Sequence, residues 1–215
     1  MAAHALAVNP RERGIRLGGI YVILNDSPAL PALARDVLDG GVRIVQYRAK
    51  SGIVKERLRR VRALTRERAA LLVVNDDWQA ALEFDCDGVH LGPDDEGFDR
   101  VAAVRARLGE RLIGLSCGTP EEVRAANAAP VDYAGIGSVY ATSSKDDAGA
   151  PIGVPALRAL VEACALPVAA IGGITLARIP EIRASGAAMA AVISAVADSS
   201  DAKRAARALV DAWQR

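Results

Sequence analysis

The chain has 215 residues, of which 51% are hydrophobic and 25% are charged, a composition that is typical of a folded globular protein and excludes a disordered or collagen-like chain. Its 27 basic and 26 acidic side chains leave a formal net charge of +1. No broad basic field is therefore available for a nucleic-acid backbone or an anionic membrane, and a bound anion must be held by a local cluster of side chains.

Cysteine usage and hydropathy predict a cytoplasmic protein. Cys86, Cys117 and Cys164 are odd in number and lack the spacing of metal ligands, which is typical of reduced thiols. The N-terminus has no basic region ahead of its short apolar run, so no secretory signal is expected. The longest uncharged stretch, 163–177, is too short to span a bilayer. The oligomeric state, monomer or homo-oligomer, is not fixed by these features.

Short apolar runs alternate with longer segments of helical period along the chain. The expected strands span 19–25, 42–48, 71–75, 88–91, 112–116, 132–137, 167–172 and 188–194. The expected helices span 28–39, 53–69, 77–83, 98–107, 120–128, 154–164, 175–184 and 201–213. This unit count predicts a single (β/α)8 TIM barrel over residues 19–215, preceded by an N-terminal extension over 1–18. An open, doubly wound sheet is the structural alternative.

Helix caps are expected at three places. Ser27 precedes Pro28, Thr119 precedes Pro120 and two glutamates, and Asp201 precedes the last helical segment. Each of these hydroxyl or carboxylate side chains can accept hydrogen bonds from the first backbone N–H groups of a helix.

The second strand ends in polar residues of one parity. Gln46, Arg48 and Lys50 occupy alternate positions, so an extended chain would place them on one face at the mouth of the barrel. The cations could simply extend to water. Two neighbouring positive charges are costly without a partner, and this favours an anion-binding site.

Carboxylates follow the third and fourth strands. Asn75 and Asp76 end one strand, and Asp95 follows the next. Either Asn75 or Asp76 could instead cap the helix that begins at Trp78. Hard oxygen ligands on neighbouring loops suit Mg²⁺, so a magnesium–diphosphate site beside the cations is a reasonable hypothesis. His90 has apolar neighbours and is predicted to be a hydrogen-bonded barrel histidine rather than a catalytic base.

The later strands also end in polar or glycine residues. Ser116 can donate to a phosphate or cap the next helix, and Cys117 has no activating neighbour in the sequence. The segment 138–152 is long for such a connection and is predicted to be a substrate lid that offers phosphate-binding groups. Those groups are Thr142, Ser144 and Lys145. After the seventh and eighth strands come Gly172-Gly173 and Ser194, where phosphate sites are common in this fold.

Taken together, these fragments resemble the thiamine phosphate synthase family over Tyr21 to Val196. The matching fragments are Gln46-Tyr47-Arg48-Ala49-Lys50, Asn75-Asp76, Gly88 to Gly92 with Asp95, Gly114-Leu115-Ser116, Asp132 to Gly137, Thr142 to Lys145, Ala170 to Ile174, and Ile193-Ser194. The resemblance implies a transferase that joins a hydroxymethylpyrimidine diphosphate to a thiazole phosphate and releases diphosphate.

The resemblance also implies roles for individual residues. The pyrimidine diphosphate would contact Gln46, Arg48, Lys50, Asn75 and Lys145, with Ser116 as the family serine. The thiazole phosphate would contact Thr142, Ser144, Gly173, Ile193 and Ser194, the last two through backbone N–H groups. Magnesium would be held by Asp76 and Asp95, and Arg48, Lys50 and Lys145 would carry the catalytic charge.

Six residues at four places depart from the family pattern, and none of these departures removes a metal ligand or a cation. They are Ser144 for threonine, Pro93 for glutamine, Cys117-Gly118 for a more polar pair, and Ala188-Met189 for Asp-Gly. Two rival functions share the fold. A thiazole tautomerase resembles this chain but uses a histidine after the fifth strand, where this chain has Ser116 to Thr119. A barrel that binds thiamine phosphates without turnover is the second rival.

Overall fold

The computed structural model describes residues 17–142, 144 and 150–215, and in it eight parallel strands close into a barrel. Each strand pairs with its sequence neighbours, and β1 closes the ring by pairing with β8. The strands are β1 (Gly19–Asn25), β2 (Ile44–Arg48), β3 (Leu71–Asn75), β4 (Gly88–Leu91), β5 (Leu112–Cys117), β6 (Tyr133–Ile136), β7 (Val168–Ile171) and β8 (Met189–Val192). The predicted TIM barrel is confirmed, and the open sheet is wrong.

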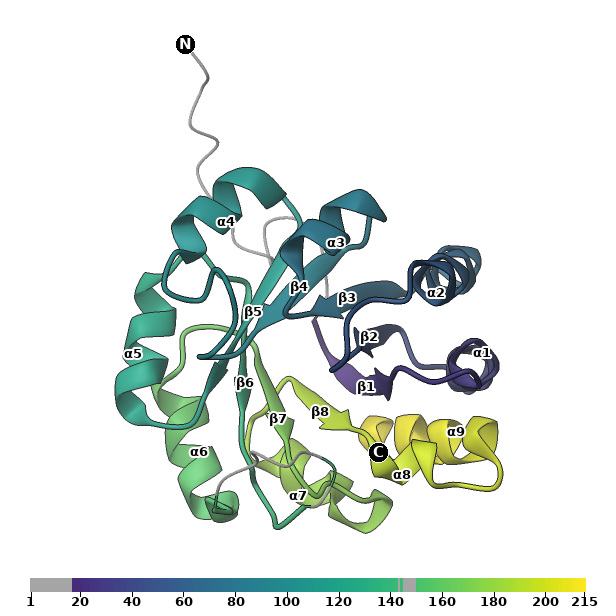
Figure 1. Ribbon diagram of the computed structural model, residues 1–215. Coiled ribbons are helices and arrows are strands. Elements are labelled where there is room, and N and C mark those ends of the chain that lie inside the picture. The colour runs from purple at the N-terminus through teal and green to yellow at the C-terminus, as the bar shows by residue number, and fades with distance from the viewer. Residues whose placement is uncertain (1–16, 143, 145–149) are drawn as a thin grey trace.

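Helices surround the barrel (Figure 1). They are α1 (Leu30–Asp39), α2 (Lys55–Glu67), α3 (Trp78–Glu83), α4 (Val101–Leu108), α5 (Pro120–Ala128), α6 (Gly153–Ala163), the 3-10 helix η1 (Leu176–Arg178), α7 (Ile179–Ala184), α8 (Ser194–Ala197) and α9 (Ala202–Gln214). The short helix α8 was not expected, because the apolar run was predicted to stay a strand as far as residue 194. Among the described residues, no helix is long and apolar enough to cross a membrane.

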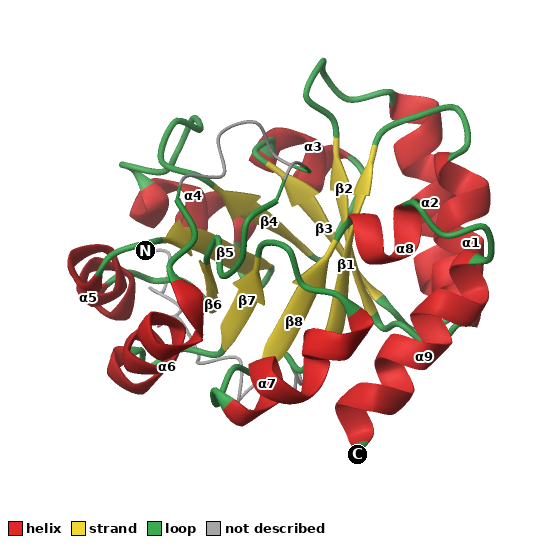
Figure 2. Cartoon of the chain, turned by 90° about the horizontal axis from the view of Figure 1, so that it is seen from below, coloured by secondary structure: helices red, strands yellow, loops and turns green. Residues whose placement is uncertain are grey.

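Strand side chains alternate between two apolar layers, as the pleat requires. The larger layer lies between the strands and the surrounding helices (Figure 2) and includes Val22, Val45, Leu72 and Ile113. The smaller one fills the barrel interior and consists of Leu17, Tyr21, Ile23, Ile44, Val73, Leu112, Tyr133, Ala169, Met189 and Ala191. Leu17 and Gly18 belong to the predicted extension 1–18, and residues 1–16 of that extension lie outside the described residues.

Two of the three expected helix caps are confirmed. Thr119 and Glu122 form a reciprocal capping box at the start of α5, and the Asp201 side chain accepts from the backbone N–H of Arg204. Ser27 is wrong as a cap, because α1 begins three residues later at Leu30 and no side chain caps it. Its backbone carbonyl instead accepts from the N–H of Leu30. The proline at position 31, in the first turn of the helix, moves the helix start away from the serine.

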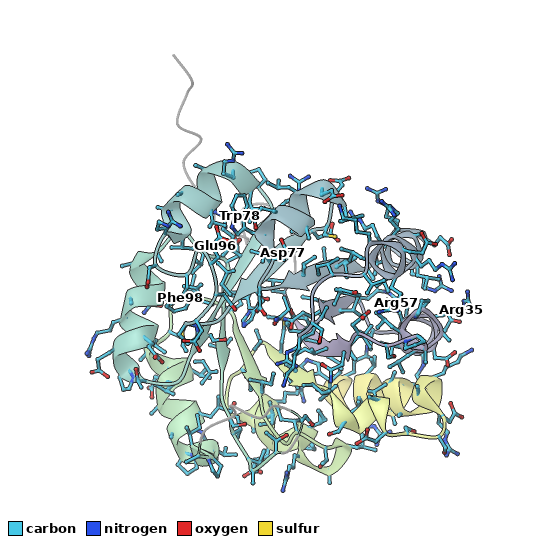
Figure 3. The ribbon with its side chains drawn as sticks, in the orientation of Figure 1. Arg35, Arg57, Asp77, Trp78, Glu96 and Phe98 are labelled. Atoms are coloured by element: carbon cyan, nitrogen blue, oxygen red, sulfur yellow. The ribbon has the colours of Figure 1, made fainter. Side chains whose placement is uncertain are left out.

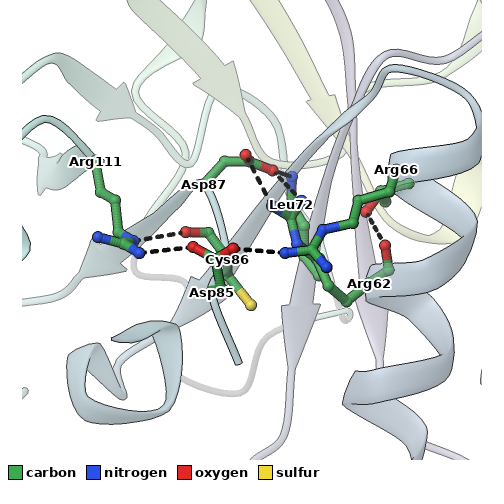
Figure 4. Close-up of polar contacts among 8 residues, drawn as sticks. Arg62, Arg66, Leu72, Asp85, Cys86, Asp87 and Arg111 are labelled. Atoms are coloured by element: carbon green, nitrogen blue, oxygen red, sulfur yellow. Dashed lines mark hydrogen bonds and ion pairs between the residues drawn. The ribbon is translucent and has the colours of Figure 1, made fainter. Parts of the chain in front are cut away.

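Ion pairs join strands and helices at the amino-terminal end of the barrel (Figure 4). Arg62 of α2 contacts Asp87, whose carboxylate also accepts from the backbone N–H of Leu72 at 2.7 Å. Asp85 pairs with Arg66 and with Arg111. These contacts connect the starts of β3, β4 and β5. They lie at the end of the barrel opposite the one where TIM-barrel active sites occur, so we assign them a role in stability.

Candidate functional site

A cavity of about 450 Å³ opens at the carboxyl-terminal ends of the strands. Its size is within the range that binds small organic ligands. Eleven of the thirteen predicted site residues line it: Gln46, Arg48, Asn75, Asp76, Asp95, Ser116, Thr142, Ser144, Gly173, Ile193 and Ser194. Lys50 is exposed and is not among the lining residues, and Lys145 lies outside the described residues. The fold therefore brings together side chains from every part of the chain between β2 and β8.

Strand β2 presents Gln46 and Arg48 to the cavity. Gln46 is only 2% exposed, and its amide nitrogen donates to the Tyr21 hydroxyl at 2.8 Å. Arg48 is half-buried, and its guanidinium contacts Asn25 Oδ1 at 3.3 Å. The strand ends at Arg48, so the alternation expected to bring Lys50 onto the same face stops two residues before it. Arg48 is thus the β2 cation that lines the cavity.

Asp76 occupies the turn between β3 and α3 in an uncommon backbone conformation. Its φ is +67°, which aspartate tolerates better than most residues, and its N–H donates to the carbonyl of His90 at 2.9 Å. Helix α3 is capped by Asp77, whose Oδ1 accepts from the N–H of Ala80 at 2.7 Å. Neither Asn75 nor Asp76 is the cap, and the Asp76 side chain lines the cavity instead.

Asp95 lies in the segment between β4 and α4. Its Oδ2 accepts from the backbone N–H of Gly92 at 2.5 Å, and this bond closes the turn that carries the carboxylate. Figure 3 shows Asp77 and Trp78 on the same side of the barrel as Glu96 and Phe98, which follow Asp95. The loops that carry Asp76 and Asp95 are therefore neighbours, as their adjacent strands require.

These two carboxylates are suitable ligands for magnesium. Mg²⁺ commonly takes one or two carboxylates and completes its shell with water and substrate phosphates. In the part of the chain that the structure describes, no group of three or more His, Cys, Asp or Glu side chains could hold a metal ion. The donor set accordingly fits an ion that is shared with a phosphorylated substrate rather than one enclosed by protein ligands.

The rings of Tyr21, His90 and Tyr133 line the cavity inside the barrel, and the two tyrosines were not among the predicted site residues. Tyr21 and Tyr133 are 1% and 0% exposed and lie edge to face, with ring centroids 6.1 Å apart. His90 bonds through Nδ1 to the Tyr133 hydroxyl and through Nε2 to Ser116 Oγ, both at 3.1 Å. The prediction that His90 is hydrogen-bonded within the barrel is confirmed. The inward parity of Tyr21 and Tyr133 was the available signal.

The ionisation of the buried phenols is strongly disfavoured. Burial raises the pKa of Tyr133 well above its usual value, and burial likewise raises that of Tyr21, with hydrogen bonds to Tyr133 and Gln46 opposing the effect. Both hydroxyls consequently keep their protons at physiological pH, and each has one proton to donate.

The loops after β6 and β7 pack closely on each other. Gly173 has a φ of +62°, and a Cβ there would lie 2.6 Å from the carbonyl oxygen of Ala141. Arg178 lies over the Tyr140 ring with its guanidinium carbon 4.0 Å from the ring centroid, and the Tyr140 hydroxyl contacts Glu181 at 2.6 Å. This packing holds the start of the segment 138–152 beside Gly173.

Two hydroxyls of that segment reach the cavity. Thr142 and Ser144 both line it, and Thr142 Oγ1 accepts from the backbone N–H of Ser144 at 3.2 Å. Residues 143 and 145–149 of the predicted lid lie outside the described residues.

The cavity wall is completed where β8 ends and α8 begins. Ile193 precedes the helix, and Ser194 is its first residue. The predicted strand thus ends two residues early, at Val192. A short helix after the eighth strand is a recurrent phosphate-binding position in TIM barrels.

Cys117 lines the cavity but is a poor nucleophile. Burial raises its pKa to about 12, so the reactive thiolate is scarce near neutral pH. Cys86, Cys117 and Cys164 are all free thiols, in agreement with the expectation from the sequence.

A closed (β/α)8 barrel with a polar cavity at the carboxyl ends of its strands has the architecture of a TIM-barrel enzyme. The family model described as thiamine monophosphate synthase matches residues 20–196, and the chain belongs to that family, whose members are transferases.

Similar proteins agree with this assignment. A thiamine-phosphate synthase of Geobacillus kaustophilus is 40% identical, over 92% of both chains. The bifunctional protein ThiM/ThiE of Symbiobacterium thermophilum is 44% identical over 91% of this chain, which spans only 41% of that protein's length. The solved structure of a thiamine phosphate pyrophosphorylase from Pyrococcus furiosus superposes with a TM-score of 0.84 at 34% identity, covering 93% of this chain and 96% of the other.

Proposed function

We propose that this chain condenses 4-amino-2-methyl-5-hydroxymethylpyrimidine diphosphate with thiazole phosphate, giving thiamine phosphate and diphosphate. The observation that carries the proposal is that Arg48, Asp76 and Asp95 line one cavity together with the hydroxyl and backbone groups of Thr142, Ser144, Gly173, Ile193 and Ser194. The family supplies the reaction, and the cavity supplies the charges that the reaction needs. Both substrates are small molecules, and the cytoplasm remains the predicted location.

The two substrates would occupy opposite sides of the cavity. Gln46, Asn75 and Ser116 would hold the pyrimidine, with Arg48 on its diphosphate. Thr142, Ser144, Gly173, Ile193 and Ser194 would hold the thiazole phosphate through hydroxyl and backbone N–H groups. Lys50 and Lys145 are proposed as further cations for the diphosphate. Such placement holds the thiazole nitrogen close to the pyrimidine methylene carbon and supplies much of the rate enhancement.

The chemistry proposed is a dissociative substitution. The C–O bond of the pyrimidine diphosphate breaks, and the diphosphate leaves with the electron pair. The thiazole nitrogen then donates its lone pair to the resulting pyrimidine methylene cation. Arg48 would stabilise the negative charge on the departing oxygens. Magnesium held by Asp76 and Asp95 would add positive charge at the same leaving group. No general base is required, since no proton is removed in forming the new C–N bond.

The test is an assay of the purified chain with both substrates, with and without Mg²⁺. Thiamine phosphate is detected as fluorescent thiochrome after dephosphorylation and oxidation. Magnesium-dependent product formation is expected, and absence of product with Mg²⁺ present would contradict the proposal and favour the non-catalytic barrel. Isomerisation of the thiazole phosphate without formation of thiamine phosphate would favour the tautomerase.

Asp95→Ala and Lys145→Ala separate catalytic from structural roles. Both variants are expected to lose far more kcat than stability. If the variants instead lose stability while the fraction that stays soluble keeps the full kcat, the assigned catalytic roles are wrong.

A further inference from the structure

A continuous chain of hydrogen bonds crosses the floor of the cavity between two of the predicted pyrimidine contacts. Gln46 Nε2 donates to the Tyr21 hydroxyl at 2.8 Å, and that hydroxyl lies 3.1 Å from the hydroxyl of Tyr133. The chain continues from Tyr133 to His90 Nδ1 and from His90 Nε2 to Ser116 Oγ, each at 3.1 Å. Five strands contribute to it, and its ends are the side chains of Gln46 and Ser116.

The number of available protons determines which group donates and which accepts in each hydrogen bond between Gln46 and Ser116. The Tyr21 hydroxyl accepts from Gln46, and its own single proton is used if it donates to Tyr133. Tyr133 then donates to His90 Nδ1, which must be unprotonated to accept. In the reverse direction, with the Gln46 amide nitrogen facing Tyr21 as it does here, the proton of Tyr21 would have no acceptor among these residues. Tyr21 is only 1% exposed, and buried donors are rarely left without an acceptor.

The direction fixes what each end offers to a ligand. A neutral His90 with Nδ1 as acceptor carries its proton on Nε2 and donates it to Ser116 Oγ. The Ser116 hydroxyl proton is then available to the cavity as a donor. At the other end one N–H of the Gln46 amide donates to Tyr21, so the Gln46 carbonyl oxygen remains available as an acceptor.

We propose that His90 is a positioning residue: as the Nε2-protonated neutral tautomer, it holds Ser116 as a donor and, through the two tyrosines, Gln46 as an acceptor. This inference rests on the proposed function. An aminopyrimidine presents an N–H donor beside a ring-nitrogen acceptor, which complements an acceptor and a donor on the protein. The 4-oxo analogue presents a carbonyl acceptor beside a ring N–H donor, so this arrangement of hydrogen bonds would select the amino form.

The barrel is shaped to hold these rings in place. His90 and Tyr133 stack with centroids 5.5 Å apart and planes 26° apart. The rings lie over two glycines, which leave room for them. A Cβ on Gly114 would lie 2.5 Å from His90 Nδ1, and one on Gly135 would lie 2.9 Å from His90 Cε1. The rings are therefore confined, and the direction of the hydrogen bonds is the remaining variable.

Tyr133→Phe tests the inference because it keeps the buried ring and removes the central hydroxyl. Without it, the Tyr21 proton has no Tyr133 oxygen to bond, so the Gln46 amide can turn over and accept from Tyr21 through its carbonyl oxygen. His90 can then accept from Ser116, and the hydrogen bonds at both ends can reverse. The dissociation constants of the pyrimidine diphosphate and of its 4-oxo analogue, each with Mg²⁺, are measured by calorimetry without thiazole phosphate. The preference for the amino form is expected to fall about tenfold.

Two further variants act as controls. Glutamine at position 90 can accept from Tyr133 and donate to Ser116, so His90→Gln is expected to keep the preference within about threefold. Tyr47→Phe removes another buried hydroxyl, which donates to Asp26 outside the cavity, and is expected to leave the preference unchanged. Tyr133→Phe could instead weaken the binding of both ligands equally and leave the ratio of their dissociation constants unchanged. That result would show that the chain of hydrogen bonds has only a structural role, and it would overturn the inference.

A measurement on the wild-type protein is independent of folding defects and of turnover. The chain has two histidines, so the ¹⁵N signals of the His90 ring are identified by comparison with a His4→Gln variant. The inference requires the pattern of a neutral ring protonated at Nε2. A ring protonated at Nδ1 overturns it even if the assay confirms the synthase activity, and an inactive protein with the expected tautomer contradicts the proposed function instead.

Discussion

Gly114 of β5 lies directly beneath the Tyr133 ring of β6, so closely that a Cβ added at Gly114 would overlap the ring carbon Cζ and lie 2.5 Å from His90 Nδ1. The register pairs Gly114 with both His90 and Tyr133 across the two neighbouring strands. Glycine weakens a strand interior, and here its place is explained by the two rings that cover it.

Gly114→Ala is accordingly expected to destabilise the protein by about 1–3 kcal/mol, because the methyl group overpacks a confined interior. Urea unfolding followed by circular dichroism measures the change. Gly18→Ala is the matched control: its Cβ would lie 3.5 Å from the nearest atom, so a change within about 0.5 kcal/mol is expected. Equal effects of the two substitutions would contradict the packing argument.

Asp95→Asn separates the turn from the proposed metal site. An amide oxygen can still accept from the Gly92 N–H, so stability is expected to change by less than about 0.5 kcal/mol. Loss of the negative charge weakens magnesium binding, and the Mg²⁺ concentration for half-maximal rate is expected to rise about tenfold or more. A magnesium titration of the initial rate measures this.

Asp99→Asn is the control for that titration, because Asp99 is exposed and does not line the cavity. Its magnesium dependence is expected to match that of the unsubstituted chain. An Asp95→Asn titration that also matches would remove Asp95 from the proposed ligands.

Much of this architecture follows from local pattern. Alternating short apolar runs predicted all eight strands, and their parity correctly placed Gln46 on the face that lines the cavity. The alternation of side chains between the two faces holds only within a strand. Because β2 ends at Arg48, this alternation does not predict which way Lys50 points. At β8 the apolar run continues into α8 without a glycine or proline to mark the boundary, and the turn at Ile193 was therefore missed.

The polar network inside the barrel could not be predicted. Tyr21 and Tyr133 are 112 positions apart, and no local pattern shows that barrel closure brings their hydroxyls together. A different ambiguity affected Asn75, Asp76 and Asp77, since all three residue types cap helices. The choice of Asp77 depends on the left-handed backbone at Asp76, which sequence alone does not reveal.

The buried thiols are expected to resist alkylation in the native state. Burial raises the pKa of Cys86 and of Cys117 to about 12, so at pH 8 roughly one molecule in 10,000 carries each thiolate. Iodoacetamide should modify these cysteines at pH 8 only after unfolding in urea, as followed by mass spectrometry. Cys164 is half-buried and serves as the internal comparison, with faster native modification expected.

The same thiols give stability a defined pH dependence. Because the pKa is raised on folding, the folded state favours the protonated thiols, and this contribution is complete below the unfolded value of about 8.5. It is lost as the pH rises towards 12. In Cys86→Ala the fall in the urea midpoint between pH 8 and pH 10 is expected to be shallower. A steeper fall would contradict the assigned direction.

The ion pair between Arg105 and Asp132 is expected to be the most sensitive of the described pairs to loss of one partner. The two side chains are 13% and 3% exposed and 2.5 Å apart, and the same Asp132 oxygen accepts from the N–H of Ile113 at 2.7 Å. Arg105→Met leaves a buried carboxylate without its cation and is expected to cost about 3–5 kcal/mol. Arg124→Met breaks an exposed pair and should cost less than about 1 kcal/mol, and comparable losses would show that burial does not set the strength of these pairs.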